Sequence, residues 1–290
     1  MRRGYSLVEV LVAVGIMALL MGLILSAVQR VRAVSARTAC SNNLRQIALA
    51  NQSYHQQANA FPAGVVGPDD KMPFSTWLVR LLPHLDQAEL WDRTVAAYQH
   101  DRSFLHDPPH TGLSRPLAVF ACAADSRAST APVLEDSIGR GLTSYLGVAG
   151  RDAGRGDGIL FLNSRVKSAD VRDGLSSTIL IGERPPSPDF HYGWWYGGWG
   201  QDLDGDCDSV LGARAVNRQN KYPSCPLGPY PFAPGKLDNS CDSFHFWSLH
   251  LGGANFAFAD GSVRFLRYST DDILPALATR AGAETVIVPE

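Results

Sequence analysis

The amino-acid sequence predicts an α+β protein, in which one long N-terminal helix packs on a mainly antiparallel β domain with a loop-rich C-terminal region. Three observations support this prediction. The chain begins with a long apolar run that passes into a segment with a helical spacing of apolar residues. Short apolar runs bounded by turn residues follow it. An Asp-Gly pair between two alternating segments near the end indicates a β-hairpin.

The first element is a predicted transmembrane helix over residues 5–28. Within residues 7–28 the only charged side chain is Glu9. About 22 residues, each adding about 1.5 Å, extend roughly 33 Å, which is enough to cross the hydrocarbon core of a membrane. A secretory signal has a shorter apolar core of about 7–15 residues. We therefore interpret the run as an anchor.

The start of this run has a more particular composition. Gly4 stands between an arginine pair and the apolar residues, where a protease on the cytoplasmic face could cut and leave Tyr5 as a new cationic terminus. An acid inside a membrane segment costs about 2–3 kcal/mol and normally has a partner. The amine of Tyr5, on the same or a neighbouring subunit, is the expected partner of Glu9.

These residues resemble the prepilin-type signal of type IV pilins and type II secretion pseudopilins. The resemblance implies that residues 1–4 are a leader, that a prepilin peptidase cleaves the bond between Gly4 and Tyr5, and that Tyr5 is N-methylated. It also implies that Glu9 pairs with the terminus of a neighbouring subunit during assembly.

The helix is predicted to continue through residues 29–60, where apolar residues form one stripe on an otherwise polar segment, and to end at Phe61-Pro62. The first half of this helix is apolar on all sides and would pack in a membrane or a helix bundle. The second half is amphipathic and would pack on the globular domain of its own chain, which is the pilin architecture. Two separate helices, broken near Gly22 or Ser35, are an open alternative.

The exported domain is expected to span residues 61–290. A shorter amphipathic helix is predicted over residues 73–98, with an interruption at Pro83. Strands are predicted at residues 117–120, 144–148, 159–162 and 177–181. Residues 191–241 have no regular period and are interpreted as a long loop region. Its aromatic centre, which could stack sugar rings or hold the loops together, consists of Tyr192, Trp194, Trp195, Tyr196 and Trp199.

The five cysteines would lie outside the cytoplasm, where disulfides are allowed. A bridge among Cys207, Cys225 and Cys241 is expected, because they lie close together in a Gly/Pro-rich segment, with its connectivity open. Cys40 with Cys122 is a second pairing. An odd number leaves at least one cysteine unpaired in the monomer.

An acidic run predicts a cation site. Carboxylates at alternate positions in a loop can surround a hard cation such as calcium. The residues are Asp202, Asp204, Asp206 and Asp208. The run is not an EF-hand, because Cys207 stands in place of the loop glycine and Ala213 in place of the final glutamate. Calcium is the one cofactor that the sequence suggests.

Near the C-terminus, Asp260-Gly261 predicts a two-residue type I′ turn. The predicted register places two pairs on one core face, Phe258 opposite Val263 and Phe256 opposite Phe265. The C-terminal region contains His250, followed after nine residues by Asp260-Gly261. This spacing is similar to the C-terminal signature of prepilin-type proteins with an H-x9-DG domain, which form domain-of-unknown-function family 1559. Further segments that resemble this family are residues 40–47, 61–62, 173–174, 182–185 and 252–256.

We predict no catalytic residues and no enzymatic activity, since no nucleophile elbow, phosphate loop or His-Glu-x-x-His motif occurs. His250 is interpreted as a structural histidine that bonds the Asp-Gly turn or the backbone of residues 252–253. His245 lies five residues away and makes a poor ligand pair with it. Glu183 and Arg184 are expected to form an ion pair.

The formal charge of −2, from 26 basic and 28 acidic residues, shows no basic surplus for nucleic acid. The sequence therefore predicts a single-pass protein of the inner (cytoplasmic) membrane, with a cytoplasmic N-terminus and a periplasmic or cell-surface C-terminal domain. Its predicted role is that of a pilin-like or pseudopilin-like subunit, which associates with itself or with related subunits in a type II secretion or type IV pilus-like system. The alternative is a membrane-anchored module that binds glycan or another surface ligand on a pilin-like stem.

Overall fold

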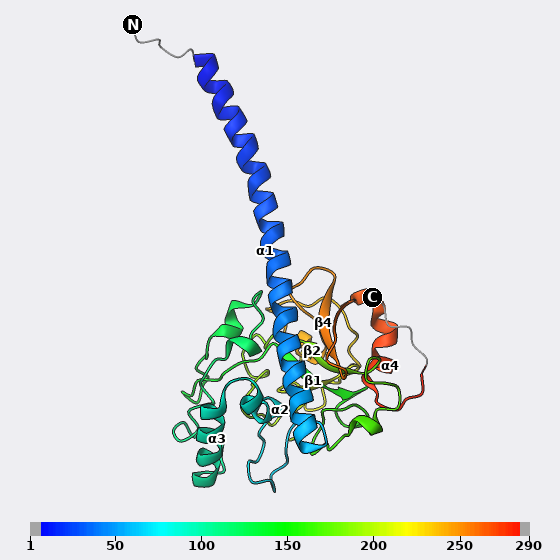
Figure 1. The fold of residues 1–290 in the computed structure, drawn as a ribbon. Coiled ribbons are helices and arrows are strands. Elements are labelled where there is room, and N and C mark those ends of the chain that lie inside the picture. The colour runs from blue at the N-terminus through cyan, green and yellow to red at the C-terminus, as the bar shows by residue number, and fades with distance from the viewer. Residues whose placement is uncertain (1–6, 285–290) are drawn as a thin grey trace.

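The computed structural model describes residues 7–284, in which one long helix, α1 (Leu7–Ala58), stands on a globular head formed by residues 59–284. The helix runs without a break for 52 residues, so the alternative of two helices is wrong. It ends just before Phe61-Pro62, as predicted. The first half of α1 projects from the head, and the second half crosses the face of the sheet (Figure 1).

The predicted amphipathic segment after α1 is helical and interrupted, as expected from its proline. It consists of α2 (Trp77–Arg80), the 3-10 turn η1 (Leu82–His84) and α3 (Ala88–His100). Pro83 lies inside η1, where its missing N–H breaks the helical hydrogen bonding. The remaining short helices are η2 (Ala118–Phe120), η3 (Ser126–Ser129), η4 (Ser168–Asp170), η5 (Ser240–Phe244), η6 (Tyr268–Ile273) and α4 (Leu274–Ala278).

A mixed sheet of five strands, in the order β3-β1-β2-β4-β5, forms the centre of the head. Its strands are β1 (Tyr145–Gly150), β2 (Ile179–Glu183), β3 (Val210–Gly212), β4 (Gly253–Phe258) and β5 (Val263–Arg267). Neighbours are antiparallel except β1 and β3, which confirms a mainly antiparallel sheet. Strand β3 lies within residues 191–241, which the sequence analysis interpreted as a loop region. It was not predicted because three residues are too few to show the period of a strand.

Two predicted strands are wrong. Residues 118–120 form the 3-10 turn η2, and only Leu117 before it is extended, so the buried Leu117 and Phe120 do not belong to one strand. Residues 159–162 make only a single bridge, between Val65 and Leu162. The Ile159 and Leu160 amides do donate to β1, at 3.4 and 3.2 Å, but both donate to the one carbonyl of Val148, so no ladder forms there.

The C-terminal hairpin forms at the predicted place but in a different register. Its loop has three residues, since the Phe258 amide donates to the Ser262 carbonyl and Gly261 adopts φ 88°. The extra residue shifts the pairing, so that Val263 lies opposite Ala257 and Phe265 opposite Asn255. The predicted pairs of Phe258 with Val263 and Phe256 with Phe265 are therefore wrong, and the four side chains do not share one face.

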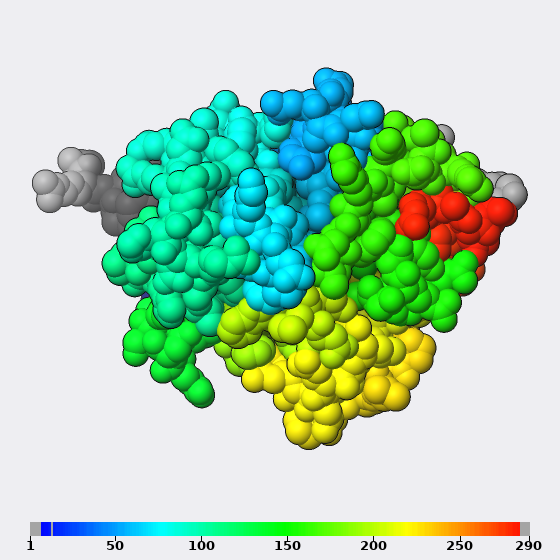
Figure 2. Space-filling view, turned by 90° about the horizontal axis from the view of Figure 1, so that it is seen from below, coloured from blue at the N-terminus to red at the C-terminus, as the bar shows by residue number. Residues whose placement is uncertain are grey.

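Both faces of the sheet are buried, and successive residues of each strand face opposite sides. On one face, Tyr145 and Ala257 pack with the second half of α1. On the other face, Leu146 and Phe256 pack with the chain after β3 and with α4. Seen from the end of the head away from the apolar half of α1, the last turns of α1 reach the surface (Figure 2). There the Ser168 amide donates to His55 Nε2 at 3.1 Å.

Candidate functional site

The projecting half of α1 carries the largest exposed apolar surface of the described chain. Its Leu, Val, Ile and Met side chains between residues 7 and 34 are exposed on all sides, by 39 to 79%. In residues 7–284, α1 is the one helix long and apolar enough to span a membrane. Contiguous apolar surface of this size needs cover by lipid or by other apolar helices.

Glu9 lies in the first turn of α1, inside this apolar surface. Its carboxylate is the one charge in residues 7–28. Gly4 and Tyr5, the predicted cleavage site, lie outside the described residues, so the structure does not test that site. Glu9, the described residue of the prepilin-type motif, therefore lies in the half of α1 that projects from the head.

Polar contacts fix the second half of α1 to the head. Asn43 Nδ2 donates to the Ala118 carbonyl at 3.2 Å and to the Ala121 carbonyl at 3.0 Å. Gln52 Nε2 donates to the Ala259 carbonyl in the hairpin turn. A rotation of the helix about its axis would break these contacts together with the apolar packing. The head therefore holds α1 in one orientation.

Two disulfides are formed among the described residues. Cys40 in α1 is joined to Cys122, with 5.1 Å between their Cα atoms, and Cys225 is joined to Cys241, with 5.3 Å. Cys207 is buried and unbridged. Both pairs belong to the alternatives that the sequence left open, and the first one ties the long helix to the head covalently.

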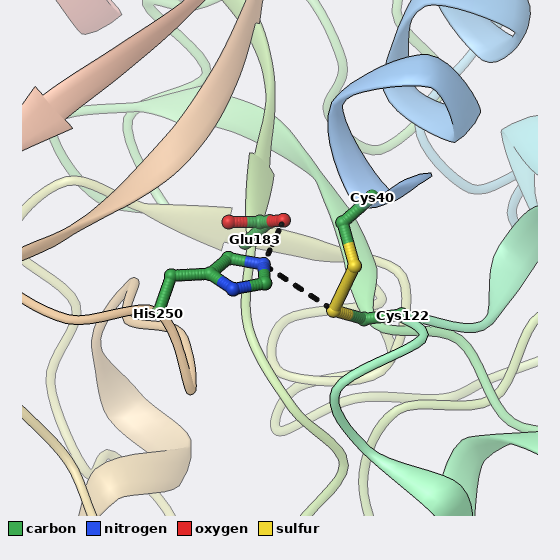
Figure 3. Close-up of side chains that lie close together, drawn as sticks. All are labelled: Cys40, Cys122, Glu183 and His250. Atoms are coloured by element: carbon green, nitrogen blue, oxygen red, sulfur yellow. Dashed lines mark hydrogen bonds and ion pairs between the residues drawn. A yellow bond between two sulfur atoms is a disulfide. The ribbon is translucent and has the colours of Figure 1, made fainter. Parts of the chain in front are cut away.

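The sequence analysis expected the His250 ring to bond the Asp-Gly turn or the backbone of residues 252–253. That expectation is wrong, because the ring lies beside Glu183 and Cys122. Its Nε2 lies 3.4 Å from Glu183 Oε1 and 3.6 Å from Cys122 Sγ (Figure 3). The hairpin turn is instead held by Asp260, whose carboxylate accepts hydrogen bonds from the Ser262 amide at 2.9 Å and from the Ser262 hydroxyl at 2.7 Å. His245 lies apart from this group, 3.0 Å from Asp242.

The expected ion pair between Glu183 and Arg184 is not formed. Glu183 is the last residue of β2, and the backbone continues beside β1 because the Arg184 amide donates to the Ser144 carbonyl, so the two successive side chains point to opposite faces of the sheet. The Glu183 carboxylate accepts one hydrogen bond from the backbone amide of Asn255, at 2.6 Å, and another from the side-chain Nδ2 of Asn255, at 2.9 Å. The buried Arg184 donates to the carbonyls of Pro185 and Cys207.

The acidic run folds around an arginine that the sequence reading missed. The guanidinium of Arg218 lies 3.0 Å from Asp202, 2.6 Å from Asp204 and 3.0 Å from Asp206. Burial raises the pKa of Asp208 to about 7, although the Gly200 amide donates to its carboxylate. Arg218 therefore supplies a positive charge where the pattern suggested a cation.

Calcium binding at this run stays a prediction. Asp206 Oδ1 and Asp208 Oδ1 are buried and accept no hydrogen bond from the described residues, which leaves two carboxylate oxygens for a hard cation. If calcium binds, calorimetry gives heat and the melting temperature rises. We expect Asp208→Asn to weaken binding at least tenfold, and exposed Asp238→Asn to leave it unchanged. No heat and no rise in melting temperature would remove calcium from consideration.

The aromatic centre of the loop region is mostly core. Trp195 and Tyr196 are fully buried, and Trp195 Nε1 donates to the Arg115 carbonyl at 2.8 Å. Trp199 is 40% exposed and lines a hollow of about 480 Å³ together with Trp194 and Arg140. Most of the cluster therefore holds the loops together, and only the hollow offers an aromatic surface to a ligand.

Comparison with known proteins agrees with the sequence patterns. The family described as "Protein of unknown function (DUF1559)" matches residues 29–272. The prokaryotic N-terminal methylation motif matches residues 1–25. The chain matches no curated protein and no solved structure. The two matches together cover both the projecting helix and most of the head.

Proposed function

The chain belongs to domain-of-unknown-function family 1559, and from this membership and its methylation motif we propose that it is a pilin-like structural subunit processed by a prepilin peptidase. The observation that carries the proposal is the continuous helix α1, whose apolar first half is exposed while its second half is buried in the head. Such a helix can be held by lipid before assembly and by neighbouring helices after it.

We place the subunit in the inner membrane before assembly, with its N-terminus in the cytoplasm and its head in the periplasm or at the cell surface. The disulfides support a head outside the cytoplasm, since disulfides persist in oxidising compartments. A type II secretion or type IV pilus-like system would supply the peptidase and the assembly platform. The head, at the far end of α1, would then lie on the outside of a filament.

Processing is tested by intact-mass analysis of the protein purified from membranes. We expect Tyr5 as the first residue, carrying one methyl group. Gly4→Val should leave residues 1–4 attached, whereas Gly15→Val, which meets no atom within 4 Å of its new Cβ, should be processed normally. Wild-type protein that keeps residues 1–4 would contradict the proposal.

Assembly is tested separately by negative-stain imaging of cells. We expect Glu9→Ala to abolish filaments or to reduce them at least tenfold, because an assembled neighbour would lose its charged partner in an apolar environment. Ser26→Ala is a control, since its hydroxyl bonds the Leu23 carbonyl of its own helix. Equal filament numbers in wild type and Glu9→Ala would show that Glu9 does not act in assembly.

A membrane-anchored glycan-binding module is the second candidate, favoured by the hollow beside Trp199. Its walls combine indole rings with the charged groups of Arg140, Asp136 and Lys221, a combination that can stack and hydrogen-bond a sugar. Wild-type cells without filaments, whose protein binds glycan and loses that binding in Trp199→Ala, would favour this candidate over the assembly subunit.

A further inference from the structure

Four buried side chains with metal-binding chemistry meet where α1 contacts the sheet. They are Cys40, Cys122, Glu183 and His250, and one potential ligand atom of each lies within 4.8 Å of those of the others. They come from α1, from the loop after η2, from the end of β2 and from the loop before β4 (Figure 3). Two sulfurs, an imidazole and a carboxylate form a donor set suited to zinc.

The distances around His250 fit a tetrahedral ion. With bonds of about 2.3 Å to sulfur and about 2.0 Å to nitrogen and oxygen, tetrahedral ligands lie about 3.3 Å apart for nitrogen and oxygen, and about 3.6 Å for nitrogen and sulfur. His250 Nε2 lies 3.4 Å from Glu183 Oε1 and 3.6 Å from Cys122 Sγ. The two sulfurs would have to separate, to about 3.8 Å, which requires the disulfide to open.

Neighbouring groups hold the ligands in place. Asn255 donates to the Glu183 carboxylate through both its amide and its Nδ2. The Ala123 amide donates to Cys40 Sγ at 3.1 Å, a contact that also stabilises a thiolate. The Ser248 hydroxyl accepts a hydrogen bond from the His250 amide at 3.0 Å and thereby fixes the loop that carries the imidazole. Groups of this kind orient metal ligands and increase metal affinity.

We propose that the reduced form of this chain binds one zinc(II)-class ion through Cys40, Cys122, Glu183 and His250, and that the disulfide is the alternative, metal-free state of the same site. A dithiol reductant gives two electrons and its two thiol protons to the S–S bond and becomes a disulfide. A phosphine gives two electrons and takes the oxygen of one water molecule to become a phosphine oxide, and that water supplies the two protons that complete the thiols. Zinc then displaces the two thiol protons to solvent and forms two sulfur bonds.

The site would cross-link the same elements in both states. The disulfide joins α1 to the loop after η2 directly. The ion would join these two segments to each other and also to β2 and to the loop before β4, because Glu183 and His250 add two further bonds. In a newly exported chain whose cysteines are still reduced, the ion would therefore hold α1 on the head before the disulfide forms.

The test uses full-length protein in detergent, reduced anaerobically with a phosphine and titrated with cobalt(II) as a spectroscopic substitute for zinc. We expect one cobalt per chain, with thiolate-to-cobalt charge-transfer bands and tetrahedral d–d bands that zinc abolishes. His250→Ala should weaken cobalt binding at least tenfold, while its oxidised form keeps the disulfide and thereby reports on folding. The double variant Cys225→Ser, Cys241→Ser is the matched control and should keep the bands.

Several outcomes would overturn the proposal. One is the absence of thiolate bands in reduced wild-type protein, both when cobalt is added to the folded chain and when the chain is refolded with cobalt present. Another is retention of the bands in Cys40→Ser, Cys122→Ser, which would assign them to other cysteines. Equal metal binding by oxidised and reduced protein would also exclude the thiolates as ligands.

Discussion

Replacing Leu44 with aspartate should lower the free energy of unfolding of the head by about 5 kcal/mol or more. Leu44 lies in the second half of α1, is fully buried and belongs to the core between α1 and the sheet. Loss of a buried leucine side chain costs about 2–5 kcal/mol, and an unpaired carboxylate in its place adds several more. A loss of this size is comparable to the whole stability of many domains, so the head should unfold.

Leu49→Asp is the matched control, because Leu49 lies on the same helix and is 56% exposed. We expect it to cost less than about 1 kcal/mol. Urea unfolding of full-length protein in detergent, followed by tryptophan fluorescence, checks both variants, since all six tryptophans follow residue 76. Equal effects of the two substitutions would show that α1 does not use its Leu44 face to hold the head.

The contrast between Leu44 and Leu49 could be predicted from the sequence, since burial along a helix follows its period of 3.6 residues. The start of the chain was equally readable, because a Gly before a long apolar run and a single acid inside it form a local motif. In both cases the residues that interact with one another, or with lipid, lie close together in the sequence. Local patterns of this kind carry most of the information about α1.

Features that depend on distant contacts could not be predicted in the same way. One additional loop residue in the β4–β5 hairpin reversed the faces expected for Val263 and Phe265. His250 and Cys122 lie 128 residues apart, and no spacing rule connects them. Three of the four alternating acids contact Arg218, which lies 12 or more residues downstream in a segment without a period.

Removing Arg218 is the second substitution for which we expect a large loss of stability. We expect Arg218→Ala to lower the free energy of unfolding by about 3 kcal/mol at pH 8, because it leaves the carboxylates of Asp202, Asp204 and Asp206 facing one another. The side chain of Asp206 is 1% exposed, so water cannot replace the lost guanidinium there. Asp206 Oδ1 already lacks a hydrogen-bond donor among the described residues.

The effect should depend on pH in a defined direction. Burial, followed by the charge of Asp204, raises the pKa of Asp206 to about 6 even with Arg218 present. Without Arg218 that pKa rises further, so the folded variant binds a proton that the unfolded chain, with an ordinary Asp pKa, has already released. The variant therefore keeps its stability near pH 4 and loses it as the pH rises through the pKa of the folded state.

Urea unfolding of wild-type and variant protein at pH 5 and pH 8 measures this difference. The difference in free energy of unfolding between wild type and Arg218→Ala should be at least twofold larger at pH 8 than at pH 5. Arg155→Ala is the control: the Arg155 side chain is 62% exposed in its pair with Asp152, so its loss should cost less than about 1 kcal/mol at either pH. If Arg218→Ala lowers the free energy of unfolding equally at both pH values, the Arg218 side chain stabilises the head through packing, and the acidic run does not need the charge of Arg218.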